Sequence, residues 1–247
     1  MPRPCGTAEV VAPGGRMPLA VCVPDGKGPF PGVLVLMEAF GLNADIQAIA
    51  GRLADEGYLT IAPDLYYREN ERTVPYAAVD RAADMVMRTI ALSDSPEERV
   101  KDDRVIADIA AGMAALKTHP QVDASRIGVL GFGMGGRLAF LAGCRMSHDV
   151  RAVVSYYPGH LVPVIGEARQ LDAPILLIFG GRDVRIPLPQ VDRIQAELAY
   201  LEIVHEIRIY RGAEHGFFSP SHPAYEARVA GEAWDETLRW LEDHLRG

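Results

Sequence analysis

The feature that most constrains the fold is a regular alternation of short apolar runs with longer segments of helical periodicity. From residue 31 onward, runs such as "PGVLVLME" and "APILLIFGG" are almost continuously apolar, as in strands that are covered on both faces. Segments between them, such as "ADIQAIAGRLADEG", place apolar residues at helical spacing. Strands that alternate with helices need crossover connections, so the sequence predicts an α/β fold with a mostly parallel central sheet flanked by helices.

The expected elements can be placed by residue number. Residues 8–13 and 17–24 flank a Gly-Gly-Arg turn and predict an opening antiparallel hairpin. Strands are expected at 31–38, 58–64, 126–132, 150–158, 173–181 and 205–212, and helices at 44–57, 77–92, 102–120, 134–146, 188–201 and 223–245. In the last helix one face carries apolar residues that we assign to the core, namely Trp234, Leu238, Leu241 and Leu245.

Length and composition indicate one domain over residues 1–247. A chain of 247 residues with 49% hydrophobic residues can bury a large core, and it contains no Gly/Ser-rich linker or short-period repeat. The stretch from Leu65 to Asp103 is the least regular part, and we expect one helix inside a longer excursion there. It is too short for a separate lid domain.

Charge and hydropathy exclude two kinds of partner. The formal net charge is −8, whereas nucleic-acid binding relies on a concentrated basic surface. The longest apolar runs have the length of a strand and could not span a bilayer. The N-terminal stretch "MPRPCGTAEVVAPGGRM" has no apolar segment followed by a cleavage site. We therefore expect a cytoplasmic monomer or homodimer that acts on a small molecule, with no nucleic-acid or membrane partner.

The cysteines predict no disulfide. Cys5, Cys22 and Cys144 form no CxxC pair, and an odd number does not suggest a disulfide framework. Buried free thiols are the expectation, as is usual in reducing compartments. Cys144 also lies well down the helix expected after Met134, over ~10 Å away at about 1.5 Å rise per residue, so it is no candidate nucleophile there.

Four residues directly follow expected strands at the edge of the sheet where ligands bind in such folds: Glu38, Gly133, Asp183 and His215. Taken singly, each has an ordinary structural explanation, such as a helix cap, a turn or a loop contact. Their order is more informative, because an elbow, a later acid and a final histidine reproduce the nucleophile, acid, base order of α/β-hydrolases. The histidine would accept a proton while the carboxylate holds its other ring nitrogen.

The stretch "GFGMGG" forms the expected elbow between a strand and a helix. Gly131 and Gly135 allow the strand and helix to approach closely around a tight turn, and Gly136 keeps the start of the helix slim. The position of the nucleophile is Gly133, which has no side chain.

With these pieces in place, the chain resembles the dienelactone hydrolase family over essentially its whole length. The matching stretches are "VLVLMEAFGLN", "IAPDLYYR", "IGVLGFGMGG", "VSYYPG", "GGRDVRIP" and "GAEHGF". The resemblance implies action on an ester or lactone carbonyl, with Asp183 as acid, His215 as base and Glu38 as the glutamate that interacts with the family's resting thiol. It also implies an oxyanion hole formed by the backbone N–H groups of Ala39 and Met134.

The chain departs from the family at the substrate side as well as at the nucleophile. The family's dienelactone hydrolases hold the substrate carboxylate partly with an arginine shortly after the catalytic histidine, and "HGFFSPSHP" offers none. This argues against a diene-carboxylate lactone. Candidate substrate contacts follow strands that end at the pocket: Tyr66, Tyr67, Arg68, Tyr157 and His160. No cofactor is expected, and no metal, because the elbow explains the grouping of Glu38, Asp183 and His215 better than a metal site does.

Gly133 leaves three alternatives open. The glycine is an introduced substitution for a native Cys or Ser; or the protein is a native catalyst in which His215 and Asp183 activate water or remove a substrate proton; or it is a pseudoenzyme that binds a small molecule or a partner. Retention of both Asp183 and His215 favours catalysis. Ser155 belongs to a neighbouring strand, and we expect its hydroxyl to bond locally rather than to attack substrate.

Overall fold

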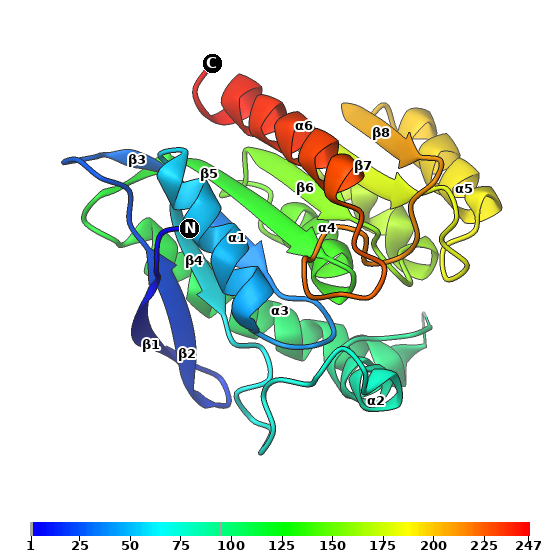
Figure 1. Cartoon of the computed structure of the whole chain (residues 1–247), viewed down its shortest axis with the longest axis horizontal. Coiled ribbons are helices and arrows are strands. Elements are labelled where there is room, and N and C mark those ends of the chain that lie inside the picture. The colour runs from blue at the N-terminus through cyan, green and yellow to red at the C-terminus, as the bar shows by residue number, and fades with distance from the viewer. Residues whose placement is uncertain (1, 94) are drawn as a thin grey trace.

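The computed structural model describes residues 2–93 and 95–247, whose strands form an eight-stranded sheet in the order β1-β2-β4-β3-β5-β6-β7-β8 (Figure 1). The pairs β1/β2 and β2/β4 are antiparallel, and every later pair is parallel. The mostly parallel sheet predicted from the alternation is therefore confirmed. The strands are β1 Gly6–Ala12, β2 Gly15–Cys22, β3 Phe30–Leu36, β4 Leu59–Pro63, β5 Val122–Phe132, β6 Ala152–Tyr156, β7 Ile175–Gly180 and β8 His205–Tyr210.

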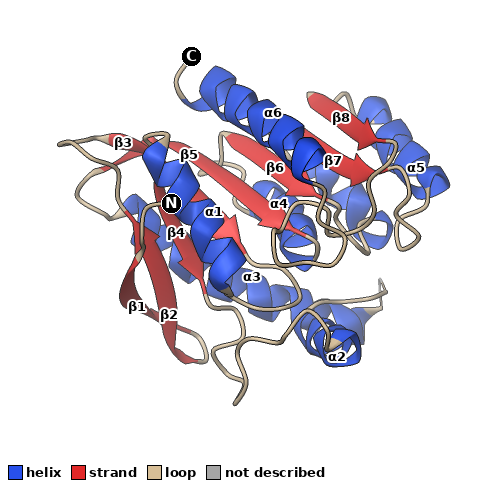
Figure 2. Cartoon of the chain, viewed as in Figure 1, coloured by secondary structure: helices blue, strands red, loops and turns tan. Residues whose placement is uncertain are grey.

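Helices cover both faces of this sheet (Figure 2). One face carries α1 and α6, and the other carries α3 and α4, which explains why the central strands are buried throughout. The helices are α1 Ala44–Asp55, α2 Val79–Thr89, α3 Pro96–Lys117, α4 Met134–Arg145, α5 Leu188–Tyr200 and α6 Ala227–Leu245. The face of α6 that the sequence assigned to the core does pack inward: Trp234, Leu241 and Leu245 are buried, and Leu238 is partly buried against the same core.

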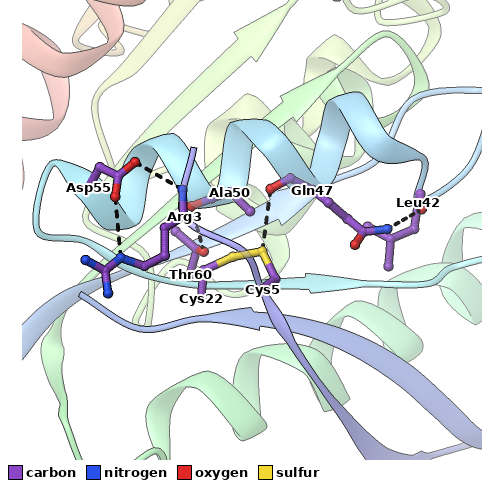
Figure 3. The surroundings of a disulfide bond; sticks show 8 residues. All are labelled: Arg3, Cys5, Cys22, Leu42, Gln47, Ala50, Asp55 and Thr60. Carbon is purple, nitrogen blue, oxygen red and sulfur yellow. Dashed lines mark hydrogen bonds and ion pairs between the residues drawn. A yellow bond between two sulfur atoms is a disulfide. The ribbon is translucent and has the colours of Figure 1, made fainter. Parts of the chain in front are cut away.

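The hairpin corrects the prediction of free thiols. Gly6 of β1 pairs with Val21 of β2, so the next position outward sets Cys5 against Cys22, with Cα atoms 4.4 Å apart, and the two form a disulfide. Figure 3 shows this bridge beside α1, whose Asp55 accepts hydrogen bonds from the backbone and side chain of Arg3. Only the expectation for Cys144 is confirmed, because it is free and buried.

The excursion between β4 and β5 contains the expected helix, α2, and its described residues form no separate lid domain. Two features were not predicted. Helix α3 begins at Pro96, several residues before the expected start, because the Ser95 side chain accepts the N–H of Glu98 and caps the helix. A 3-10 helix, η1 Val162–Gln170, follows β6. Within the described ranges, no helix has both the length and the apolar character that crossing a bilayer requires.

Candidate active site

The elbow between β5 and α4 is held by close backbone contacts that exclude side chains. A Cβ on Gly131 would lie 1.9 Å from the carbonyl oxygen of Gly135, and a Cβ on Gly135 would lie 2.3 Å from that of Leu36. Gly133 between them has φ 55° and ψ −114°, a conformation that residues with a Cβ rarely adopt. The glycines thus serve the tight strand-to-helix turn predicted from the sequence.

The elbow position faces His215. A Cβ built on Gly133 would lie 3.9 Å from His215 Nε2, and no other described atom outside its chain neighbours would lie within 4 Å. Any group that occupied this space would be within reach of a ring nitrogen. The structure therefore brings together the elbow and the histidine that follow β5 and β8, as the chain order predicted.

Asp183 fixes the other side of the imidazole. Its Oδ2 lies 2.7 Å from His215 Nδ1, and its Oδ1 accepts the backbone N–H groups of Arg185 and Ile186 at 2.8 and 3.1 Å. Burial raises the pKa of Asp183, but the hydrogen bond and charge of His215 and the two N–H groups outweigh it, and the pKa is lowered overall. The carboxylate stays ionised and accepts Nδ1–H, which leaves Nε2 as the basic nitrogen.

Glu38 lies at the end of β3 in a buried polar network. Its side chain is 4% exposed, and Oε1 accepts hydrogen bonds from the Tyr76 hydroxyl and, at 3.3 Å, from Asn43 Nδ2. The same Tyr76 oxygen lies 2.9 Å from Oδ2 of the buried Asp45. Burial raises the pKa of Glu38 to about 7, against the opposing effect of its hydrogen bonds from Tyr76 and Asn43 and with a further rise from the charge of Asp45.

The backbone donors expected to hold an oxyanion lie on the same cavity. Met134 is the first residue of α4, so its N–H has no partner within the helix, and neither it nor the Ala39 N–H donates to a described acceptor. Tyr66 stands behind this pair, with its hydroxyl 3.0 Å from the Ala39 carbonyl oxygen. Ser155 Oγ donates to the Gly136 carbonyl of α4 at 2.8 Å, so its hydroxyl is engaged by the backbone, although by a neighbouring helix rather than locally.

These groups line a cavity of about 560 Å³ at the carboxyl ends of β3, β5, β6 and β7. Of the expected substrate contacts, Tyr157 and His160 lie on it. Its walls include Val86 and Ile90 from α2 and its end, and Val162 and Pro163 from η1. Four polar residues that the sequence had not singled out also line it, namely Arg185, Gln190, Arg193 and His222.

Tyr66, Tyr67 and Arg68 require a correction, since none of them lines the cavity. Tyr66 is buried behind the oxyanion donors, and the chain then turns toward the hairpin. There the Tyr67 hydroxyl donates to Asp108 at 2.9 Å, and Arg68 forms an ion pair with the same carboxylate. The end of β4 was located properly, but the direction of the loop after it is set by these long-range contacts.

A buried ion pair supports the helix of the elbow. Arg137 in α4 binds Asp102 of α3 through two hydrogen bonds of 2.7 Å, and both side chains are almost fully buried. Arg137 Nε also donates to the His160 carbonyl at 3.0 Å, which fixes a wall of the cavity. In the described ranges no group of three or more His, Cys, Asp or Glu side chains is arranged to hold a metal ion.

Comparisons with known proteins agree on one family. The sequence pattern of the Dienelactone hydrolase family matches residues 17–245. An Escherichia coli K12 protein named "Putative carboxymethylenebutenolidase" is 31% identical over 249 residues, which cover 97% of this chain and 87% of that protein. A Yersinia pestis protein of the same name is 30% identical, with 97% and 88% covered. A crystal structure from Klebsiella pneumoniae, described as a "Putative Dienelactone Hydrolase", is similar with a TM-score of 0.81 at 27% identity, and covers 97% of this chain and 98% of that one.

Proposed function

This chain belongs to the dienelactone hydrolase family, a family of α/β-hydrolases, and from that premise we propose that it hydrolyses a small ester or lactone by direct attack of water. His215 acts as the general base, Asp183 holds it, and no covalent intermediate forms on Gly133. The curated relatives support the substrate class, because they are named as carboxymethylenebutenolidases, which are lactone hydrolases.

The single observation that carries this proposal is the space between the elbow and the histidine. A side chain at Gly133 would begin 3.9 Å from His215 Nε2, so a water molecule that fits there instead reaches that nitrogen directly. With Nδ1–H bound to the ionised Asp183, Nε2 accepts a proton from the water. The hydroxide adds to the carbonyl carbon, and the developing oxyanion is held by the N–H groups of Ala39 and Met134.

The cavity supports a small substrate. Its volume of about 560 Å³ and its apolar walls from α2 and η1 suit a compact ester or lactone. We assign Tyr157 and His160 to substrate contact because they lie on this cavity. Arg185, Arg193 and His222 join them as contacts, since each brings N–H donors to the same space.

A second candidate function follows from the missing side chain at Gly133. A protein that kept the pocket and lost the nucleophile would bind a small molecule or a partner without turnover. A glycine introduced in place of Cys or Ser would likewise leave this chain without turnover. Restoring a cysteine at position 133 distinguishes a binding protein from an inactivated hydrolase.

Four proteins test the proposal: the chain as written, Gly133→Cys, and each of these with His215→Ala. Turnover of 4-nitrophenyl acetate and of γ-butyrolactone is measured for all four after circular dichroism has established folding. Activity of the written chain that depends on His215 supports direct base catalysis. Activity that arises only with Gly133→Cys supports an inactivated hydrolase, and inactivity of all four folded proteins supports a binding protein.

We also propose that the protein works in the cytoplasm as a monomer or homodimer, without a nucleic-acid, membrane or cofactor partner. The Cys5–Cys22 disulfide opposes the cytoplasmic location, because disulfides are rare in reducing compartments. A thiol count on protein trapped with alkylating agent at the moment of lysis decides between them: three free thiols support the cytoplasm and one free thiol contradicts it. Sedimentation of the purified chain gives the oligomeric state.

A further inference from the structure

Glu38 shares the hydroxyl of Tyr76 with a second buried carboxyl group, that of Asp45. The Tyr76 oxygen is in hydrogen-bond contact with both Glu38 Oε1 and Asp45 Oδ2, yet its hydroxyl carries one hydrogen and can donate to only one of them. One of the two carboxyl groups is therefore left without this donor. Two buried carboxyl groups that share a site favour protonation of one of them, because the like charges repel each other.

That proton belongs on Glu38 rather than on Asp45. Asp45 is already satisfied as a carboxylate, because it accepts the backbone N–H and the hydroxyl of Ser221, both at 3.0 Å. Glu38 accepts the Asn43 amide and the Tyr76 hydroxyl, both at Oε1. The Ser219 hydroxyl lies close enough to lower the pKa of Glu38, but it makes no hydrogen bond among the described residues. Oε2 makes no hydrogen bond with a described residue. Burial, which raises the pKa of Glu38 to about 7, favours the same assignment.

Glu38 also faces the reacting space. It lines the same cavity as Gly133 and His215, and it directly precedes Ala39, whose N–H is assigned to the oxyanion hole. The fully buried Tyr157 hydroxyl beside this cavity has no hydrogen-bond partner among the described residues, and burial raises its pKa. The cavity thus has a basic nitrogen on one side and a neutral acid on another.

We infer that Glu38 is a catalytic proton donor, which protonates the leaving oxygen of an ester or lactone from its free carboxyl oxygen. The inference rests on the proposed function. His215 takes a proton from water, the hydroxide adds to the carbonyl carbon, and the C–O bond then breaks. Its electrons go to the leaving oxygen, which takes the proton of Glu38; Glu38 becomes a carboxylate that accepts from Tyr76 and Asn43. The proton on His215 returns to Glu38 through solvent, so the net reaction consumes one water.

A donor of this kind matters only when the leaving group is a poor one. 4-Nitrophenolate leaves without protonation, whereas an alkoxide released from an alkyl ester or a saturated lactone must be protonated as the bond breaks. Glu38→Gln keeps the size and the Oε1 acceptor but cannot release a proton. Its effect should therefore depend on the leaving group, which no merely structural role would produce.

The test compares 4-nitrophenyl acetate with γ-butyrolactone for the wild type, Glu38→Gln and the remote control Glu9→Gln on the hairpin. Glu38→Gln should lower kcat/KM for the lactone by about 100-fold or more and change it for the activated ester by about 3-fold or less. Glu9→Gln should change neither. Equal losses on both substrates, or no loss on either, would overturn the inference.

The pH profile gives a second readout. Lactone hydrolysis by the wild type should fall as pH rises above about 7, and that fall should be missing for the activated ester and in Glu38→Gln. The titratable groups around Glu38 come from several elements, and each has to be considered when the profile is assigned: Asp45 of α1, Tyr66 after β4, Tyr76 before α2, Tyr157 after β6, and His215 and His222 after β8.

An infrared measurement tests the stored proton without any turnover. The difference spectrum between the wild type and Glu38→Gln should contain the band of a protonated carboxyl group at pH 6 and lose it at pH 9. If Glu38 is ionised at pH 6, the inference fails even when the enzyme is active. If the band is present and neither substrate is turned over, the proposed function fails and the proton donor fails with it.

Discussion

The hairpin edge of the sheet and the carboxyl edge of its parallel strands differ in whether their polar groups have hydrogen-bond partners. At the hairpin, the Tyr67 hydroxyl receives the Gly14 N–H and donates to Asp108, which also pairs with Arg68. At the carboxyl edge, Gly133 occupies a conformation that residues with a Cβ rarely adopt, and the buried Tyr157 hydroxyl has no partner among the described residues. At the hairpin edge, the polar groups have hydrogen-bond partners that join separate segments. The carboxyl edge contains a strained backbone position and a buried hydroxyl without a partner among the described residues.

This difference indicates where in such a chain binding or catalytic residues lie. Unsatisfied buried groups and strained backbone lower stability, and they persist at places where a protein binds or transforms something. On this view the two regions can be separated by mutation: changes at the hairpin should alter stability alone, whereas changes at the carboxyl edge should alter activity first.

The largest effect is expected from His215→Ala. Removal of the base should lower kcat/KM for ester hydrolysis by about 1000-fold or more, since general base and oriented water act as one unit. The melting temperature should change less than the activity, because the ring is partly exposed and its contacts with buried residues include only Asp183 and the Tyr157 ring among the described interactions. Steady-state kinetics measure the change in kcat/KM, and thermal unfolding measures the change in melting temperature. A variant with wild-type turnover would remove His215 from the mechanism.

Cys5→Ser should produce the reverse pattern. Loss of a bridge with a sequence separation of 17 residues should lower the free energy of unfolding by about 3 kcal/mol, mainly because the unfolded chain gains freedom. Activity at 25 °C should match the wild type. Urea unfolding measures the first effect, with the wild type under reducing conditions as the matched control. A large loss of activity in the folded variant would break the separation of the two regions.

Glu38→Gln should change how stability depends on pH. The pKa of Glu38 is raised in the folded state from 4.5 to about 7, so its contribution to stability is present below pH 4.5 and is lost as pH rises through about 7. Relative to the variant, the wild type should therefore lose about 3 kcal/mol between pH 4.5 and pH 8.5. Denaturant unfolding at the two pH values gives the difference. Parallel stability curves would show that the carboxyl is ionised throughout.

Gly133→Ala should have the smallest effect on stability. A Cβ at φ 55° and ψ −114° adds backbone strain of about 1–2 kcal/mol, although the space around it is open. Activity should fall too, since the methyl group occupies the space assigned to water. Gly159→Ala, where a Cβ would meet nothing within 4 Å, is the control for an added methyl group at the cavity. A stabilised Gly133→Ala would argue against strain at the elbow.

Much of the fold could be predicted because its signals are local. Apolar runs, helical spacing and the glycines of the elbow depend on neighbouring residues, and they located the sheet, the helices and the order of Gly133, Asp183 and His215. The disulfide was missed because the turn was placed wrongly. A turn over residues 14–16 pairs Pro13 with Met17 and sets Cys5 against Asp25, whereas the observed turn at Pro13 and Gly14 pairs Ala12 with Gly15 and sets Cys5 against Cys22.

The rest of the site depends on contacts between distant loops. The positions of Tyr67 and Arg68 are set by Asp108, which is about forty residues away in sequence. The network of Glu38, Tyr76 and Asp45 joins three segments that show no common pattern in the sequence. The start of α3 is a different case, because Ser95, Pro96 and Glu98 form a recognisable helix start that the charged composition of the stretch concealed.

The central claim is that water attacks the substrate directly at Gly133. The most direct test is intact-protein mass spectrometry during steady-state turnover of 4-nitrophenyl acetate, with Gly133→Cys as the matched control. We predict that the wild-type chain keeps its unmodified mass while product accumulates without a burst, and that the variant shows an acetyl adduct. An acetylated wild-type chain that forms and decays at the rate of turnover, or an unmodified chain that releases no product, would contradict the account.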